Sequence, residues 1–247
     1  MSDSTASPDP VPALGGIEQR VAGAGGAELR VNDSGGEGPT IVFTHGWADD
    51  STAWAGTVAA LGDDARCLTY DLRGHGDSDV PAPGNYTRVD AMTDLQAIID
   101  LADGPVVLAG HSYGGYLSLA HTIAKPDQVL GLVLVAAGPG FRKDEAREQW
   151  NESVDVSAKK LGVPEGSEEL SKHVDAWVID SLSEITAPAV VIVGEYDKRF
   201  AASAAVFEKY LDVRSSIVVP DSGHSVHKKR GAAVAGEVRK LLAEIDS

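Results

Sequence analysis

Six short runs of apolar residues constrain the fold of this chain more than any other feature of its sequence. Most of these runs end in Gly, His or Asp, and they read TIVFTHG, ARCLTYD, PVVLAGH, VLGLVLVAA, PAVVIVGEYD and RSSIVVPDSGH. Continuous apolar stretches of this length, rich in Val, Ile and Leu, are typical of strands buried on both faces of a parallel sheet. The sequence therefore predicts a sheet whose strands mostly run in the same direction.

The segments between these runs have the periodicity of helices. Apolar residues recur at helical spacing over 86–103, 204–213 and 232–245. Alternating strands and helices predict the α/β class, with a doubly wound, mostly parallel sheet and helices on both of its faces. Ahead of the first run, residues 17–22 and 27–33 alternate apolar and polar side chains around GAGG, which predicts two antiparallel strands at an edge of the sheet.

One interval departs from this alternation and predicts a small cap. Residues 139–187 contain no strand-like run, whereas 143–150 and 167–185 are polar and helix-like. We expect one α/β domain over 15–247, with 139–187 inserted as a small helical cap, since the interval is too short for a core of its own. Residues 1–14 are predicted to be a disordered tail, because the first twelve are rich in Ser, Asp and Pro.

Charge and cysteine content exclude several classes of partner and location. Acidic residues outnumber basic ones by 37 to 21, giving a net charge of -16, which disfavours binding to nucleic acids and anionic membranes. The basic cluster at 227–230 is interpreted as a solvated face. A single cysteine, Cys67, excludes an intrachain disulfide, and neither a signal peptide nor a membrane span is apparent. We therefore expect a cytoplasmic protein that acts on a small molecule.

The stretch GHSYG, residues 110–114, matches the pattern G-x-S-x-G. It follows the apolar run PVVLA and precedes the helix-like YLSLAHTIA. This is the strand, turn and helix order of a nucleophile elbow, in which Gly110 and Gly114 allow the two backbones to approach closely. Ser112 is therefore predicted to be a nucleophile. The alternative is that it is simply a small residue where a strand becomes a helix.

From Ile17 onward the chain resembles the α/β-hydrolase family. The resemblance rests on GHSYG together with HGW (45–47), DLRGHGDSD (71–79), GEYD (194–197) and DSGH (221–224). In that family the first of these further motifs carries an oxyanion turn, and the last two carry the acid and the histidine. The resemblance thus implies a catalytic triad of Ser112, Asp197 and His224.

Serine chemistry requires such partners, because a hydroxyl is a weak nucleophile without a base that is held by a carboxylate. All three residues follow predicted strands, and open α/β sheets place their sites at the carboxyl ends of strands. Two alternatives remain at this stage. Glu195 could replace Asp197 as the acid, and His227 could replace His224 as the base.

The remaining histidines are assigned structural roles. His45, His75 and His111 lie inside the motifs, where a hydrogen-bonded structural role is expected, while His121 and His173 are interpreted as ordinary helix-face residues. Their spacing matches no metal-binding pattern, and the sequence has neither a GxGxxG motif nor a P-loop. We expect neither a metal nor a cofactor.

Two backbone N–H groups, those of Trp47 and Tyr113, are expected to form the oxyanion hole. The side chains of Trp47, Tyr113, Trp150 and Trp177 are candidates for the walls of the substrate pocket. Each could instead serve only in packing.

Serine at the elbow also restricts the reaction. Members of the family that cleave haloalkanes or epoxides carry aspartate there, so Ser112 favours acyl transfer to water, with ester hydrolysis as the leading function. The same triad serves thioesterases, carbon-carbon bond hydrolases, perhydrolases and lyases, and a non-catalytic small-molecule receptor is a further alternative. A cap this short predicts an accessible pocket for small to medium acyl groups.

Overall fold

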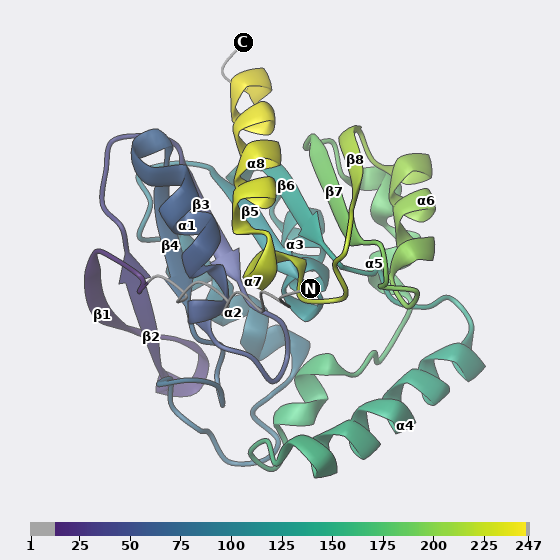
Figure 1. The fold of residues 1–247 in the computed structure, drawn as a ribbon. Helices are drawn as coiled ribbons and strands as arrows, with labels where there is room; N and C mark the ends of the chain where they lie inside the picture. Colours follow the sequence, from purple (N-terminus) through teal and green to yellow (C-terminus); the bar gives the residue numbers. More distant parts are fainter. Residues whose placement is uncertain (1–12, 246–247) are drawn as a thin grey trace, which may run out of the picture.

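An eight-stranded sheet forms the centre of the computed structural model, which describes residues 13–245 (Figure 1). The strands lie in the order β1-β2-β4-β3-β5-β6-β7-β8. Their bounds are β1 Ile17–Ala22, β2 Glu28–Asp33, β3 Thr40–Thr44, β4 Arg66–Tyr70, β5 Val106–His111, β6 Val129–Val135, β7 Ala189–Gly194 and β8 Val213–Val219.

The strand directions confirm the predicted fold class. β1 and β2 pair antiparallel at one edge, β2 pairs antiparallel with β4, and the pairs from β4 to β8 are all parallel. Every residue of β5 and β7 is buried, as expected of continuous apolar runs in the middle of a covered sheet. Each of the six predicted runs forms one of these parallel strands.

Helices cover both faces of the sheet (Figure 1). Core residues on α2, α3 and α6 belong to one apolar cluster, and those on α1 and α8 belong to the other. The helices are α1 Ala55–Leu61, α2 Arg88–Ile99, α3 Tyr113–Ala124, α4 Asp144–Leu161, α5 Trp177–Asp180, α6 Ala201–Tyr210, α7 Val226–Lys229 and α8 Gly231–Ile245. Sequence periodicity did not predict α1, because its seven residues are too few to establish a period.

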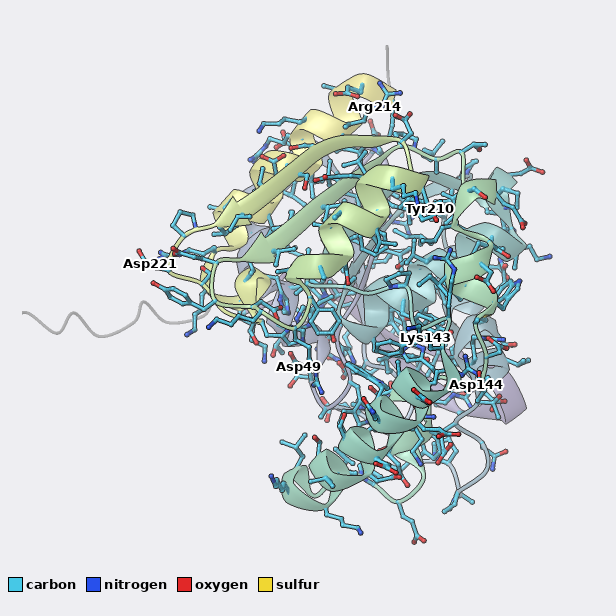
Figure 2. All side chains as sticks on the ribbon, turned by 90° about the vertical axis from the view of Figure 1, so that its right-hand side faces the viewer. Asp49, Lys143, Asp144, Tyr210, Arg214 and Asp221 are labelled. Carbon is cyan, nitrogen blue, oxygen red and sulfur yellow. The ribbon has the colours of Figure 1, made fainter. Side chains whose placement is uncertain are left out.

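Helix α4 projects away from the sheet and is the longest helix of the segment 139–187, with Lys143 and Asp144 at its start (Figure 2). The helix predicted over 143–150 extends to Leu161. The prediction of a helix over 167–185 is wrong: this segment forms two short 3-10 turns, Ser167–Ser171 and Leu182–Glu184, with α5 between them.

Side-chain partners explain why that second helix does not form. Both backbone groups of His173 bond to the side chain of Asn151, and the backbone N–H of Trp177 bonds to Asp175. These bonds satisfy backbone groups that a continuous helix would have paired internally. Tertiary contacts therefore override a modest helical pattern here.

The ends of the chain and its cysteine complete the comparison with the sequence. Most of the tail predicted over 1–14 lies outside the described residues, and Leu14 packs against the cluster beneath α1 and α8. Cys67 is buried, and burial raises the pKa of its thiol to about 12. Within residues 13–245, every helix is too short or too polar to span a bilayer.

Candidate active site

Ser112 occupies a strained turn between β5 and α3. Its φ of 52° and ψ of -115° lie in a region that residues with a side chain rarely adopt. A Cβ on Gly110 would clash with the backbone of Gly114, and one on Gly114 would clash with the carbonyl of Thr44. The two glycines therefore permit the close approach that holds the serine on the turn, as the motif predicted.

Asp197 and His224 come together from the ends of two neighbouring strands, β7 and β8. His224 Nδ1 donates to Asp197 Oδ2 at 2.8 Å. The Asp197 side chain is 4% exposed, whereas that of His224 is 41% exposed. A buried carboxylate thus orients the ring of a histidine that remains accessible.

The residues considered as alternatives to Asp197 and His224 do not form an acid and histidine pair. Glu195 Oε2 accepts a hydrogen bond from the backbone N–H of Asp221, so it holds the loop after β8 rather than a histidine. His227 is fully buried, and neither of its ring nitrogens has a hydrogen-bond partner within the described residues.

Ser112 and His224 are linked through the residue that precedes the serine. His111 Nε2 donates to the carbonyl of His224 at 3.0 Å, and the two rings lie 4.6 Å apart. On its other side, His224 stacks on Phe200 at 4.9 Å. Ser112 Oγ makes no hydrogen bond to His224 among residues 13–245, and such bonds are often long before substrate binds.

The turn after β3 lies against the elbow and offers the expected amides. A Cβ on Gly46 would lie 3.3 Å from Ser112 Cβ. The backbone N–H groups of Trp47 and Tyr113 donate no hydrogen bond within the described part of the chain. Tyr113 also begins α3, so the positive end of the helix dipole adds to its N–H group.

Two structural histidines hold this turn in place. His45 Nδ1 donates to the carbonyl of Gly46 at 2.7 Å, while its Nε2 accepts from the N–H of Leu72 at 2.9 Å. His75 Nε2 accepts from the N–H of Ala48 at 3.0 Å. Both rings are buried, and burial lowers their pKa, so they stay neutral and can accept these bonds.

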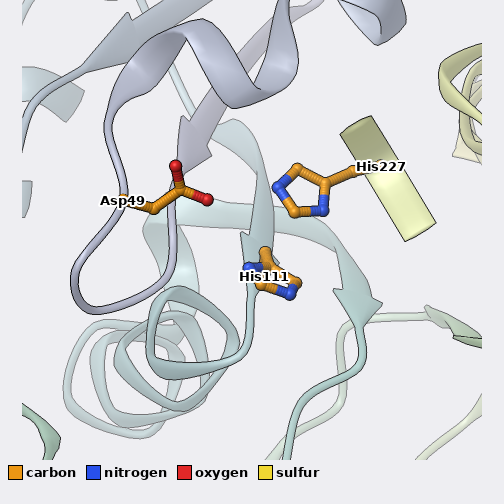
Figure 3. A group of neighbouring side chains, drawn as sticks. All are labelled: Asp49, His111 and His227. Atoms are coloured by element: carbon orange, nitrogen blue, oxygen red, sulfur yellow. The ribbon is translucent and has the colours of Figure 1, made fainter. Parts of the chain in front are cut away.

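Close to His224, the side chains of Asp49, His111 and His227 point toward one another (Figure 3). Their possible ligand atoms all lie within 4.8 Å of one another, although the three residues are far apart in the sequence. Spacing rules could not have found this group. The ammonium of Lys228 lies 2.6 Å from Asp49 Oδ1 and already balances its charge. Burial lowers the pKa of His227 to about 3, so that ring is neutral.

A cavity of about 200 Å³ opens beside Ser112, beneath the cap. Tyr113 and Trp150 line it, as proposed from the sequence, but Trp47 and Trp177 do not. Trp47 Nε1 instead donates to the carbonyl of Ser167 in the cap, and Trp177 lies under the guanidinium of Arg88. A larger cavity of about 650 Å³ lies on the other side of Tyr116, and its lining contains none of the predicted site residues.

Sequence reasoning missed several residues of the smaller cavity: Tyr116, Phe141, His173, Arg199 and Phe200. The interpretation of His173 as a helix-face residue is wrong, because it lies in the loop before α5 and faces this cavity. Arg199 and Phe200 follow Asp197 by two and three residues, which is a usable local signal. For Phe141 and His173 the sequence carries no such signal, because their positions depend on how the cap folds back.

Comparison with known proteins agrees with the fold. A family model described as alpha/beta hydrolase fold matches residues 39–161, which include the turn after β3 and the elbow. The chain belongs to the α/β-hydrolase fold superfamily.

Among its relatives, a 2-succinyl-6-hydroxy-2,4-cyclohexadiene-1-carboxylate synthase from Enterobacter is 25% identical over 83% of this chain and 92% of that protein. A pimeloyl-[acyl-carrier protein] methyl ester esterase from Nitrosomonas europaea is 37% identical, over 47% of this chain and 42% of its own length. A thermophilic esterase from Thermogutta terrifontis superposes with a TM-score of 0.77 at 23% identity, over 94% of this chain and all of that one.

Proposed function

We propose that the protein is a serine hydrolase that cleaves acyl esters of small molecules through Ser112, His224 and Asp197. One observation carries this proposal: His224 Nδ1 donates to the buried Asp197, at a strand end next to a serine on a strained elbow. With Nδ1 carrying the proton, Nε2 has a free lone pair and can act as a base.

In the first half of the reaction, His224 Nε2 removes the proton of Ser112 as Oγ attacks the ester carbonyl. Asp197 keeps the imidazole in the required tautomer and stabilises its charged form. The carbonyl oxygen becomes an oxyanion that accepts hydrogen bonds from the N–H groups of Trp47 and Tyr113. His224 then gives the proton to the leaving alkoxide, and the alcohol departs.

The second half releases the acid. His224 deprotonates a water molecule, which attacks the acyl-enzyme, and the proton returns to Ser112 Oγ as the carboxylic acid leaves. The modest volume of the cavity favours small to medium acyl groups. Rates measured with esters of increasing acyl length test this preference, and strict dependence on one large substrate would count against it.

Removal of the nucleophile tests the central proposal. We expect Ser112→Ala to lower kcat for p-nitrophenyl acetate by about 10³-fold or more, because covalent catalysis is lost. Ser216→Ala is the matched control, since Ser216 is exposed on β8 and away from the cavity. Near-normal turnover by Ser112→Ala, after correction for any contaminating esterase, would refute the proposal.

Two other functions have distinct outcomes in the same experiments. The Enterobacter relative, which aligns with most of this chain, supports a synthase reaction at the same triad as the second candidate. Full labelling of Ser112 by a fluorophosphonate with no turnover of any ester would favour it. Absence of labelling in folded protein would favour a non-catalytic receptor.

A further inference from the structure

The imidazole of His173 is a buried polar group that the proposed ester hydrolysis does not use. The residue is 8% exposed and lines the same cavity as Ser112. Its Nδ1 is buried without a partner, and Nε2 also makes no hydrogen bond within residues 13–245. Buried polar atoms are nearly always paired, so a ring with two free nitrogens beside a nucleophile indicates a ligand-binding role.

The backbone of His173 is fixed by the cap helix. Asn151, on α4, donates from Nδ2 to the His173 carbonyl at 3.0 Å and accepts from its N–H at 2.9 Å. Since both backbone groups are paired with one side chain, the residue is anchored while its ring stays uncommitted. The cap thus presents an oriented imidazole to the cavity.

The ring is neutral at ordinary pH. Burial, together with the nearby Arg88 and Arg147 and against the opposite effect of Asp175, lowers the pKa of His173 to about 4. A neutral imidazole has one N–H donor and one lone-pair acceptor. It can therefore donate to a carbonyl oxygen, and it can either donate to or accept from a hydroxyl.

Aromatic rings surround this donor and acceptor. The ring of His173 lies 4.5 Å from Tyr116, 5.4 Å from Phe141 and 5.8 Å from Trp150, measured between centroids. Tyr113 and Phe200 complete the lining. Arg199, the charged residue of the lining, stacks on Trp150 and donates to Ser153 Oγ. Aromatic walls beside a neutral imidazole with free nitrogens are suited to an aromatic ring that carries an oxygen substituent.

We propose that His173 forms a specificity subsite that hydrogen-bonds a hydroxyl or carbonyl oxygen on the aromatic part of an ester substrate. This inference rests on the proposed function, because it assumes that the ester lies in the cavity beside Ser112. It assigns substrate selection to the cap and bond cleavage to the sheet.

Binding to a Ser112→Ala protein tests the subsite without turnover. The probes are methyl benzoate and its ring-hydroxylated and ring-acetylated isomers, measured by calorimetry. We expect at least one substituted isomer to bind about tenfold or more tightly than methyl benzoate, because a site built for a hydrogen bond rejects an analogue that lacks it. Adding His173→Leu should reduce this preference to about twofold or less.

Two further variants separate recognition from folding. His173→Gln keeps a donor and an acceptor and should restore part of the preference. His121→Leu, which removes another buried histidine, on α3 and outside the cavity, should retain it fully. Equal binding of all isomers, or a preference that survives His173→Leu in folded protein, would overturn the subsite.

The subsite and the ester hydrolysis can fail separately. If wild-type protein hydrolyses p-nitrophenyl acetate but Ser112→Ala shows no preference among the benzoates, only the subsite is wrong. If no ester is hydrolysed but the His173-dependent preference is present, the subsite stands and the proposed reaction is wrong.

Discussion

At the scale of single residues, the candidate active site depends on a position that carries no side chain. Gly46 lies in the turn after β3, and a Cβ there would lie 2.7 Å from His111 Nδ1. His111 cannot easily move away, since its Nε2 is bonded to the carbonyl of His224. Any side chain at position 46 would therefore displace Ser112 and His111, and through His111 also His224.

We expect Gly46→Ala to lower kcat for p-nitrophenyl acetate by about 10- to 100-fold, because small displacements of reacting groups are costly. Gly56→Ala is the matched control. Gly56 is on α1, where a Cβ would meet only an ordinary contact at 3.9 Å, so this change should preserve kcat. Steady-state rates and melting temperatures of the two variants check this prediction, and an unchanged kcat for Gly46→Ala would contradict it.

The same scale shows what the sequence could reveal of the site. Ser112, Asp197 and His224 each follow a strand, so topology alone brings them to one edge of the sheet. The group of His173 and Phe141 was not predictable, because a bond between Asn151 and the His173 backbone decides where the loop lies. The catalytic roles of Ser112, Asp197 and His224 stay predictions for the variants to test.

At the scale of elements, a buried ion pair joins α2 to the loop after β4. Arg73 Nε donates to Asp94 Oδ2 at 2.6 Å, and the guanidinium also donates to Asp94 Oδ1 at 2.6 Å. Both side chains are almost completely buried. The guanidinium reaches the carbonyls of Ala24 and Asn85 as well, so one side chain ties together three segments.

We expect Asp94→Ala to reduce the free energy of unfolding by about 3–5 kcal/mol, because it leaves a buried arginine without its partner. Asp100→Ala, at the exposed end of the same helix, should change it by less than about 0.5 kcal/mol. Urea unfolding measures both. A loss below about 1 kcal/mol for Asp94→Ala would show that the pair contributes little.

Elements differed in how well the sequence predicted them. The inner parallel strands were found because strands buried on both faces are mostly apolar, a signal that needs no partner to interpret. β8, at the edge of the sheet, instead alternates exposed and partly buried residues, and only its last residues gave the apolar signal. Helix α1 is too short for a period, and the broken segment at 167–185 follows side-chain partners rather than its own pattern. Local sequence therefore determined the sheet, while tertiary contacts determined the second half of the cap.

At the scale of the whole molecule, buried histidines make stability depend on pH. Burial lowers the pKa of His75 and His173 to about 4 and that of His227 to about 3. In the unfolded chain a histidine titrates near 6.5. Between these values the unfolded state binds more protons than the folded state, so stability rises with pH and is lost as the pH falls from about 6.5 toward 3.

We expect the free energy of unfolding to fall steeply between pH 6.5 and 5. His227→Phe removes one of these titrating rings and keeps an aromatic ring between Trp54 and His111, so its loss over this range should be smaller by roughly 1.5 kcal/mol. Denaturant unfolding at both pH values checks this. Equal losses in the two proteins would mean that folding does not lower the pKa of His227.

The place where the cap joins the sheet has a consequence for the ancestry of this chain. Strands β6 and β7, which flank the cap in the sequence, are parallel neighbours in the sheet, so the chain leaves the carboxyl end of β6 and must cross to the amino end of β7. Any insertion long enough to make this crossover preserves the order of the strands. Residues 139–187 can therefore be exchanged by recombination for a segment of another length without reordering any strand. Recombination of this kind would combine the reaction carried by the sheet of one ancestral protein with the substrate preference carried by the inserted segment of another.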